Sequence, residues 1–160
     1  MKAMVKKLTI TLMIVSFVLC WPMASMAKEV AGIKIIDFGL YKTTSAGWQE
    51  APGTQRGMIQ LIGQRELVKR TKMIPTSAGT EFGIRYVVNG QEEGGEVHLL
   101  VRVSHSEMQS SEEWVATRQI GTPSFEGWKF DSHSEMVPGK LTVQLFHQGI
   151  KLAEKSFTLY

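Results

Sequence analysis

Residues 97–104 read VHLLVRVS, and this stretch decides the fold. Its apolar side chains recur at every second position. Successive side chains of a β-strand point to opposite faces of the sheet, so the alternation predicts a strand with one face in a hydrophobic core. The core face would be formed by Val97, Leu99, Val101 and Val103, and the opposite face by His98, Leu100, Arg102 and Ser104.

The alternation continues on both sides of this strand. Residues 82–89 form a second stripe, with Phe82, Ile84, Tyr86 and Val88 in one phase. Residues 141–145 and 152–160 predict a hairpin, because both alternate and the residues His147-Gln148-Gly149 between them suit a tight turn.

Three segments are less regular. In residues 32–42, Ile33 and Ile35 lie in one phase while later apolar residues lie in the other, which predicts a β-bulge or a strand that moves between sheets. Residues 59–61 predict one strand and residues 67–74 a second that stops at Pro75. Residues 107–118 fit a helix or a strand equally well.

Glycine, proline, asparagine and serine interrupt the chain about every ten residues, and no repeat or linker divides it. This pattern predicts an all-β fold. We expect residues 28–160 to form a single immunoglobulin-like antiparallel β-sandwich of about seven to nine strands. The Cys and Trp hallmarks of antibody domains are absent, so the prediction concerns the architecture and implies no relationship to antibodies.

The N-terminus predicts export. Residues 1–27 combine three early lysines, an uncharged apolar run from Leu8 to Trp21, and Ser25-Met26-Ala27, whose small residues suit signal peptidase. We expect a signal helix cleaved after Ala27 and a periplasmic or secreted domain without membrane insertion. Retention as an anchor is the alternative, since residues 8–27 approach the length that spans a bilayer. A lipid anchor on Cys20 is a further alternative, but Leu19 is too large for the position before a lipid-modified cysteine.

Cleavage would change the composition. Residues 1–27 carry three of the 18 Lys and Arg and none of the 15 Asp and Glu, so the remaining chain has 15 of each and no net charge. The basic excess therefore gives no support for nucleic-acid binding. Cys20 is the only cysteine and would leave with the signal, together with any disulfide or thiol chemistry. A domain of 133 residues can bury a core without disulfides.

Five short motifs follow one another in the order of residues 37–41 (DFGLY), 74–75 (IP), 79 (G), 82–86 (FGIRY) and 137–139 (VPG). Together they resemble a bacterial family known only as a domain of unknown function. The family implies an exported, Ig-like sandwich and supplies no activity, cofactor or catalytic residue. One position differs, because an aromatic residue is expected after the Pro-Gly corner where this chain has Lys140.

No catalytic constellation is visible in the sequence. The Gly-x-Ser-x-Gly elbow of serine hydrolases is absent, and a cysteine nucleophile is absent from the exported part. We expect a protein that is not an enzyme and needs no cofactor. Histidine is a common metal ligand, and Asp131, His133 and Glu135 form the closest cluster for a metal ion. An ordinary solvated turn is the favoured interpretation, because Asp and Ser are frequent turn residues.

Tryptophan side chains raise the question of carbohydrate binding. Exported sandwiches often stack sugars on exposed aromatic rings. Trp48 lies in a Gly- and Pro-rich stretch and Trp114 follows two glutamates, so both are candidates for contact with a ligand, whereas Trp128 is expected in the core. The leading expectation is a non-enzymatic binding or adaptor domain of the bacterial cell envelope whose partner is an unknown protein or envelope component. A small-ligand module for a metal ion or carbohydrate is the alternative.

Overall fold

The computed structural model describes residues 30–50 and 58–160. The proposed signal peptide, residues 1–27, lies outside this part of the chain. The described residues contain one 3₁₀ turn, His133–Glu135, and no helix long and apolar enough to cross a membrane. The strands are β1 (Val30–Glu50), β2 (Met58–Lys69), β3 (Met73–Ile74), β4 (Glu81–Gly90), β5 (Glu96–His105), β6 (Ser110–Gln119), β7 (Pro123–Lys129), β8 (Gly139–His147) and β9 (Ile150–Leu159).

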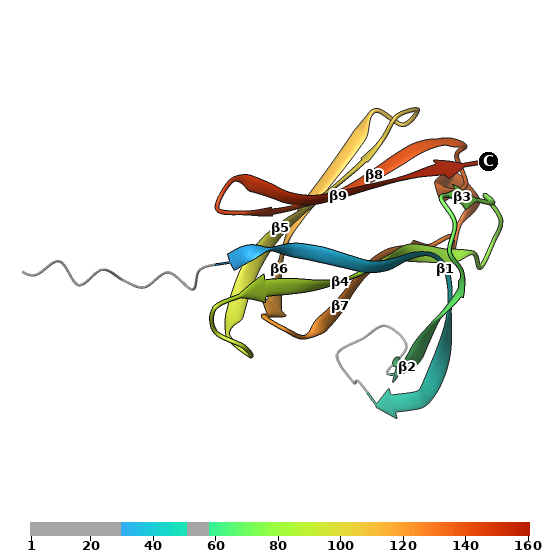
Figure 1. Ribbon diagram of the computed structural model, residues 1–160. Coiled ribbons are helices and arrows are strands. Elements are labelled where there is room, and N and C mark those ends of the chain that lie inside the picture. The colour runs from blue at the N-terminus through green and yellow to red at the C-terminus, as the bar shows by residue number, and fades with distance from the viewer. Residues whose placement is uncertain (1–29, 51–57) are drawn as a thin grey trace, which may run out of the picture.

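The strands form two sheets that pack as a sandwich (Figure 1). The β1 sheet has the order β2-β1-β4-β7, and the β5 sheet has the order β3-β9-β8-β5-β6. Neighbouring strands run antiparallel except β3, which pairs with β9 in parallel. The predicted all-β sandwich and its strand number are therefore confirmed.

The core follows the alternation seen in the sequence. Phe82, Ile84, Tyr86 and Val88 of β4 are fully buried, as are Leu99 and Val101 of β5. The rings of Phe82 and Phe157 meet edge to face across the two sheets, with centroids 5.4 Å apart. Both predicted core stripes thus face each other between the layers.

Strand β1 resolves its change of phase with a bulge. Ile35 pairs with Tyr86 and Asp37 with Arg85, so Ile36 is an extra residue in β1. The bulge lets the apolar residues before and after it face the same core. Strand β1 stays within one sheet, pairing with β4 and, from Leu40 onward, with β2.

The prediction for residues 67–74 was wrong. Strand β2 runs without a break from Met58 to Lys69, and only Met73 and Ile74 form a further strand, in the opposite sheet. Between them Thr71 Oγ1 accepts a hydrogen bond from the Met73 backbone N–H at 3.0 Å. Such a side-chain to backbone bond competes with strand pairing, and it turns the chain so that Ile74 enters the core.

The structure also decides the predictions for residues 107–118 and for the C-terminal hairpin. Residues 110–119 form a strand and not a helix. The C-terminal hairpin is confirmed, with Gln148 and Gly149 at φ values of 48° and 79°. Two consecutive positive φ values define the type I′ turn that matches strand twist.

A buried ionic cluster ties the two sheets together on one side. Glu126 of β7 points inward and is 6% exposed. Tyr86 donates its hydroxyl hydrogen to Glu126 Oε1 at 3.1 Å, and Arg118 of β6 forms an ion pair with the same oxygen. Arg118 Nε also donates to the Tyr86 hydroxyl at 3.1 Å. Each polar group in the cluster therefore has a partner, and the cluster joins the edge strands β6 and β7.

Removing one member of this cluster should destabilise the sandwich. We expect Glu126→Ala to lower the free energy of unfolding by about 3 kcal/mol, because Arg118 and Tyr86 lose their shared acceptor. The measurement is urea unfolding of residues 28–160 followed by far-UV circular dichroism. Glu113→Ala is the control, since Glu113 pairs with Arg102 on an exposed face and should contribute less than about 1 kcal/mol. Equal effects of the two substitutions would contradict this assignment.

Candidate functional site

The outward face of the β1 sheet carries a second polar network. Because of the bulge, Asp37 lies on this face and directly opposite Arg85. Arg85 Nε donates to Asp37 Oδ2 at 3.0 Å, and Tyr41 donates its hydroxyl hydrogen to Asp37 Oδ1. Asp37 and Tyr41 are only 4% and 5% exposed, so these two side chains are shielded from solvent, whereas the Arg85 side chain is 42% exposed.

Phe125 lies flat on the same face. A Cβ atom added at Gly83 or Gly127 would come within 2.7 Å and 2.4 Å of the Phe125 ring, so glycine is required beneath it. The edge of the Tyr41 ring meets Phe125 at 4.8 Å between centroids and 75° between planes. The ring therefore packs on bare backbone and is held from the side by Tyr41.

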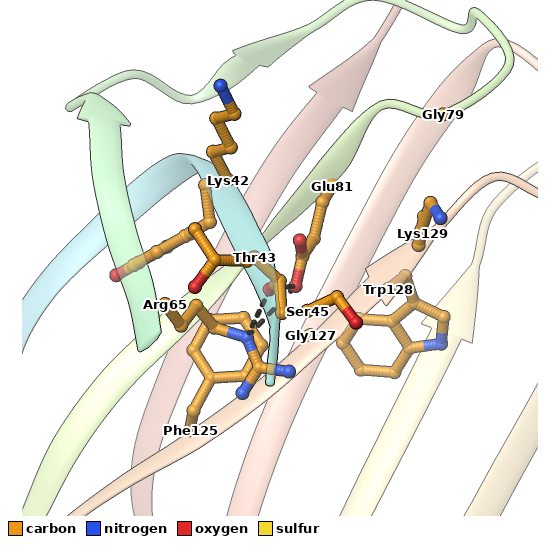
Figure 2. A pocket seen from close by; sticks show the side chains of 12 residues that line it. Lys42, Thr43, Ser45, Arg65, Gly79, Glu81, Phe125, Gly127, Trp128 and Lys129 are labelled. Carbon is orange, nitrogen blue, oxygen red and sulfur yellow. Dashed lines mark hydrogen bonds and ion pairs between the residues drawn. The ribbon is translucent and has the colours of Figure 1, made fainter. Parts of the chain in front are cut away.

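Arg65 of β2 completes the stack. Its guanidinium carbon lies 4.0 Å above the centroid of the Phe125 ring. Its Nε donates to Glu81 Oε1 at 2.9 Å and to Thr43 Oγ1 at 3.1 Å, and Thr43 donates in turn to Glu81 Oε1 at 2.6 Å. Figure 2 shows these contacts between three neighbouring strands. The guanidinium is fixed in both orientation and position.

A cavity of about 410 Å³ opens beside this stack. It forms where the β1–β2 ribbon bends away from the rest of the sheet, at register shifts between Thr43 and Gly47 (Figure 1). We call it the β1–β2 pocket. Its volume falls in the range of small-molecule sites. It is lined by Tyr41, Lys42, Thr43, Thr44, Ser45, Arg65, Gly79, Glu81, Phe125, Gly127, Trp128 and Lys129.

The pocket retains polar groups that can serve a ligand. Within the described residues, the two Nη groups of Arg65 have no hydrogen-bond partner, and Oε2 of Glu81 has none either. Arg65 and Glu81 side chains are 28% and 12% exposed. Lys129 stands opposite Glu81 in the sheet register, whereas Lys42 extends away from the Arg65–Glu81 contact (Figure 2). The pocket thus presents a donor and an acceptor side by side.

Burial shifts two tyrosine pKa values upward. Burial, the hydrogen bond to Asp37 and the charge of Asp37 raise the pKa of Tyr41 well above its ordinary value. Burial and the charge of Glu126 likewise raise the pKa of Tyr86, against a smaller opposing effect of Arg118. Both hydroxyl groups therefore remain protonated donors at neutral pH.

The predicted metal cluster lies in the 3₁₀ turn after β7. Asp131, His133 and Glu135 are all exposed. Glu135 Oε2 accepts the backbone N–H groups of Asp131 and Ser132 at 2.9 Å and 3.3 Å, which lowers the pKa of Glu135. Its carboxylate is thus engaged in closing the turn. Across residues 30–50 and 58–160, no group of three or more His, Asp or Glu side chains is arranged to hold a metal ion.

The two candidate tryptophans lie in different sheets. Trp48 pairs with Gln60 in the β1–β2 ribbon, and its side chain is outside what the structure describes. Trp114 of β6 is half-buried, with its ring centroid 6.0 Å from that of Trp128, and packs against the core. The structure does not bring Trp114 to the ribbon that carries Trp48.

His105 has a structural role. It is 7% exposed and lines a second cavity of about 220 Å³. Its Nδ1 accepts hydrogen bonds from the backbone N–H groups of Glu107 and Met108, both at 3.2 Å, and its Nε2 lies 3.0 Å from the carbonyl oxygen of Val137. This pattern fits the neutral ring with the proton on Nε2. His105 joins the β5–β6 turn to the corner before β8.

The architecture places the protein among immunoglobulin-like β-sandwiches. An immunoglobulin-like protein from Pseudomonas aeruginosa, known from a crystal structure, superposes with a TM-score of 0.52 at 19% sequence identity. The match covers 84% of this chain and 99% of that one, and it establishes the shared fold. No curated protein matches the sequence.

The chain belongs to the family described as Domain of unknown function (DUF3859), whose model matches residues 29–159. The expected family is therefore confirmed. Its two longest motifs pair across β1 and β4, and they supply Asp37, Tyr41, Gly83 and Arg85 of the outward network.

Alkaline pH should test the two buried tyrosines. The folded protein keeps both protons at pH values where unfolded tyrosines, with a pKa of about 10, have lost theirs. The contribution of these two protonated hydroxyl groups to stability is fully present below about pH 10. Above that pH, the free energy of unfolding should fall by at most about 1.4 kcal/mol per pH unit for each tyrosine. Urea unfolding between pH 8 and pH 11 measures this slope. A Tyr41→Phe/Tyr86→Phe double variant should show a shallower decline, and an identical decline would contradict the assignment.

Proposed function

We propose that this protein is an exported, non-enzymatic binding domain of the cell envelope that holds its ligand in the β1–β2 pocket. Export is expected from residues 1–27, with their apolar run and small-residue cleavage site. The observation that carries the proposal is the Arg65 guanidinium, which is held in place by stacking on Phe125. Its Nε is hydrogen-bonded, and its two Nη groups have no hydrogen-bond partner among the described residues.

The arrangement favours recognition because its polar groups are positioned before a ligand arrives. A free arginine side chain loses considerable conformational entropy when it is immobilised by a ligand. In this site the stacking on Phe125 and the bonds to Thr43 and Glu81 already impose that order. A ligand therefore gains the hydrogen bonds of Arg65 at a lower entropic cost.

A metal-binding function has less support. The carboxylate of Glu135 already accepts two backbone hydrogen bonds, and the side chains of Asp131 and His133 are exposed around it. To bind a metal ion through Oε2, Glu135 would have to give up these two hydrogen bonds. The β1–β2 pocket, in contrast, has donor and acceptor groups in reserve.

Site-specific photocrosslinking in intact cells tests the proposed function. A photoreactive amino acid at Lys42 or at Lys129, both exposed at the pocket, should capture one dominant envelope component. The control is the same amino acid at Val115, which is 67% exposed on the outward face of the β5 sheet. Capture of the same components from Val115, or of nothing from either pocket position, would overturn the proposal.

A further inference from the structure

We propose that the ligand of the β1–β2 pocket is a saccharide unit whose neighbouring hydroxyl groups bind Arg65 and Glu81 together. This inference rests on the proposed binding function and names its ligand class. It starts from the Nη groups of Arg65, which can donate, and Oε2 of Glu81, which can accept, side by side in one cavity.

The hydrogen-bonding pattern matches a polyol. Each sugar hydroxyl accepts from one group and donates to another. The Nη groups of Arg65 can donate to one hydroxyl, while Oε2 of Glu81 can accept from the next. Because Arg65 Nε and Glu81 Oε1 hold each other at 2.9 Å, the free edges of the two groups stay adjacent.

The charge distribution favours a neutral ligand over an anion. A carboxylate or phosphate at the Arg65 edge would also face the negative charge of Glu81, which already compensates the guanidinium. Lys42 and Lys129 are the remaining cations of the lining, and both are exposed. Lys42 extends away from the Arg65–Glu81 contact (Figure 2), and Lys129 stands 3.7 Å from Asp131, so solvent and salt screen the fields of both. Hydroxyl groups gain both hydrogen bonds without this repulsion.

The size and walls of the pocket fit the same ligand. A volume of about 410 Å³ accommodates one or two sugar rings. Ser45 and Thr44 contribute hydroxyl groups to the lining. The ring of Phe125 is covered by Arg65 and by glycine backbone, and Trp128 packs against Phe82 and Trp114. A lining of this kind suits the hydroxyl-bearing edge of a pyranose ring.

Binding can be measured with defined sugars. The exported domain is titrated with methyl glucoside, its uronic acid counterpart, and di- and trisaccharides of glucose and of N-acetylglucosamine, and followed by ¹⁵N chemical shifts. At least one neutral sugar should bind, with shifts confined to residues 41–45, 65, 79–81 and 125–129. Its affinity should change less than about threefold between 50 and 500 mM salt, since no net charge is neutralised.

Matched substitutions test the two polar partners. Arg65→Gln and Glu81→Gln should each weaken sugar binding by about tenfold, the loss expected for one hydrogen bond to a charged group. Arg102→Gln and Glu113→Gln are the controls, because Arg102 stacks on Phe146 at 4.9 Å and pairs with Glu113 on the opposite sheet. The controls should leave the affinity unchanged. The shift map of the unsubstituted protein remains informative even where a variant fails to fold.

The outcomes separate the two proposals. Binding of the acidic sugar alone, abolished by salt, would overturn the neutral-saccharide assignment in favour of an anion site. Failure of every sugar at tens of millimolar would also overturn it, while a protein captured from Lys42 and Lys129 would leave the binding function standing. Failure of both experiments would remove both proposals.

Discussion

The extra residue in β1 is the constraint on which the rest of the structure depends. Without the bulge at Ile36, the strand could bury the isoleucines before it or Phe38 and Leu40 after it, but not both. The bulge places all of them on the core and turns Asp37 and Tyr41 outward. Tyr41 then holds Phe125 from the side, and Phe125 supports Arg65. One local irregularity thus links the core to the pocket.

The two buried carboxylates show how this sandwich tolerates charge. Glu126 lies between the sheets and Asp37 on an outer face, yet each receives a tyrosine hydroxyl and an arginine. A buried carboxylate without such partners would shift toward its neutral form or destabilise the fold. Asp37 and Glu126 therefore act as connectors, one within the β1 sheet and the other between β6 and β7.

The sequence predicted what depends on local pattern. Alternation located β4, β5 and the β8–β9 hairpin, and the change of phase in β1 indicated the bulge, because each signal lies within about ten residues. The pocket escaped prediction, since Arg65, Glu81 and Phe125 are far apart in sequence and meet only through the register of four strands. Gly83 and Gly127 gave a usable signal, because glycines inside strands often mark a close approach.

A comparison of the two outer faces shows that composition alone does not make the pocket. Arg102, Glu113 and Phe146 repeat the arginine, glutamate and phenylalanine trio on the β5 sheet. There the two charged side chains are 40% and 42% exposed, against 28% and 12% for Arg65 and Glu81. The difference lies in the backbone, because β5 and β6 pair without a register shift whereas the β1–β2 ribbon bends at irregular positions. The bend shields the pair, and shielding strengthens each hydrogen bond that it offers.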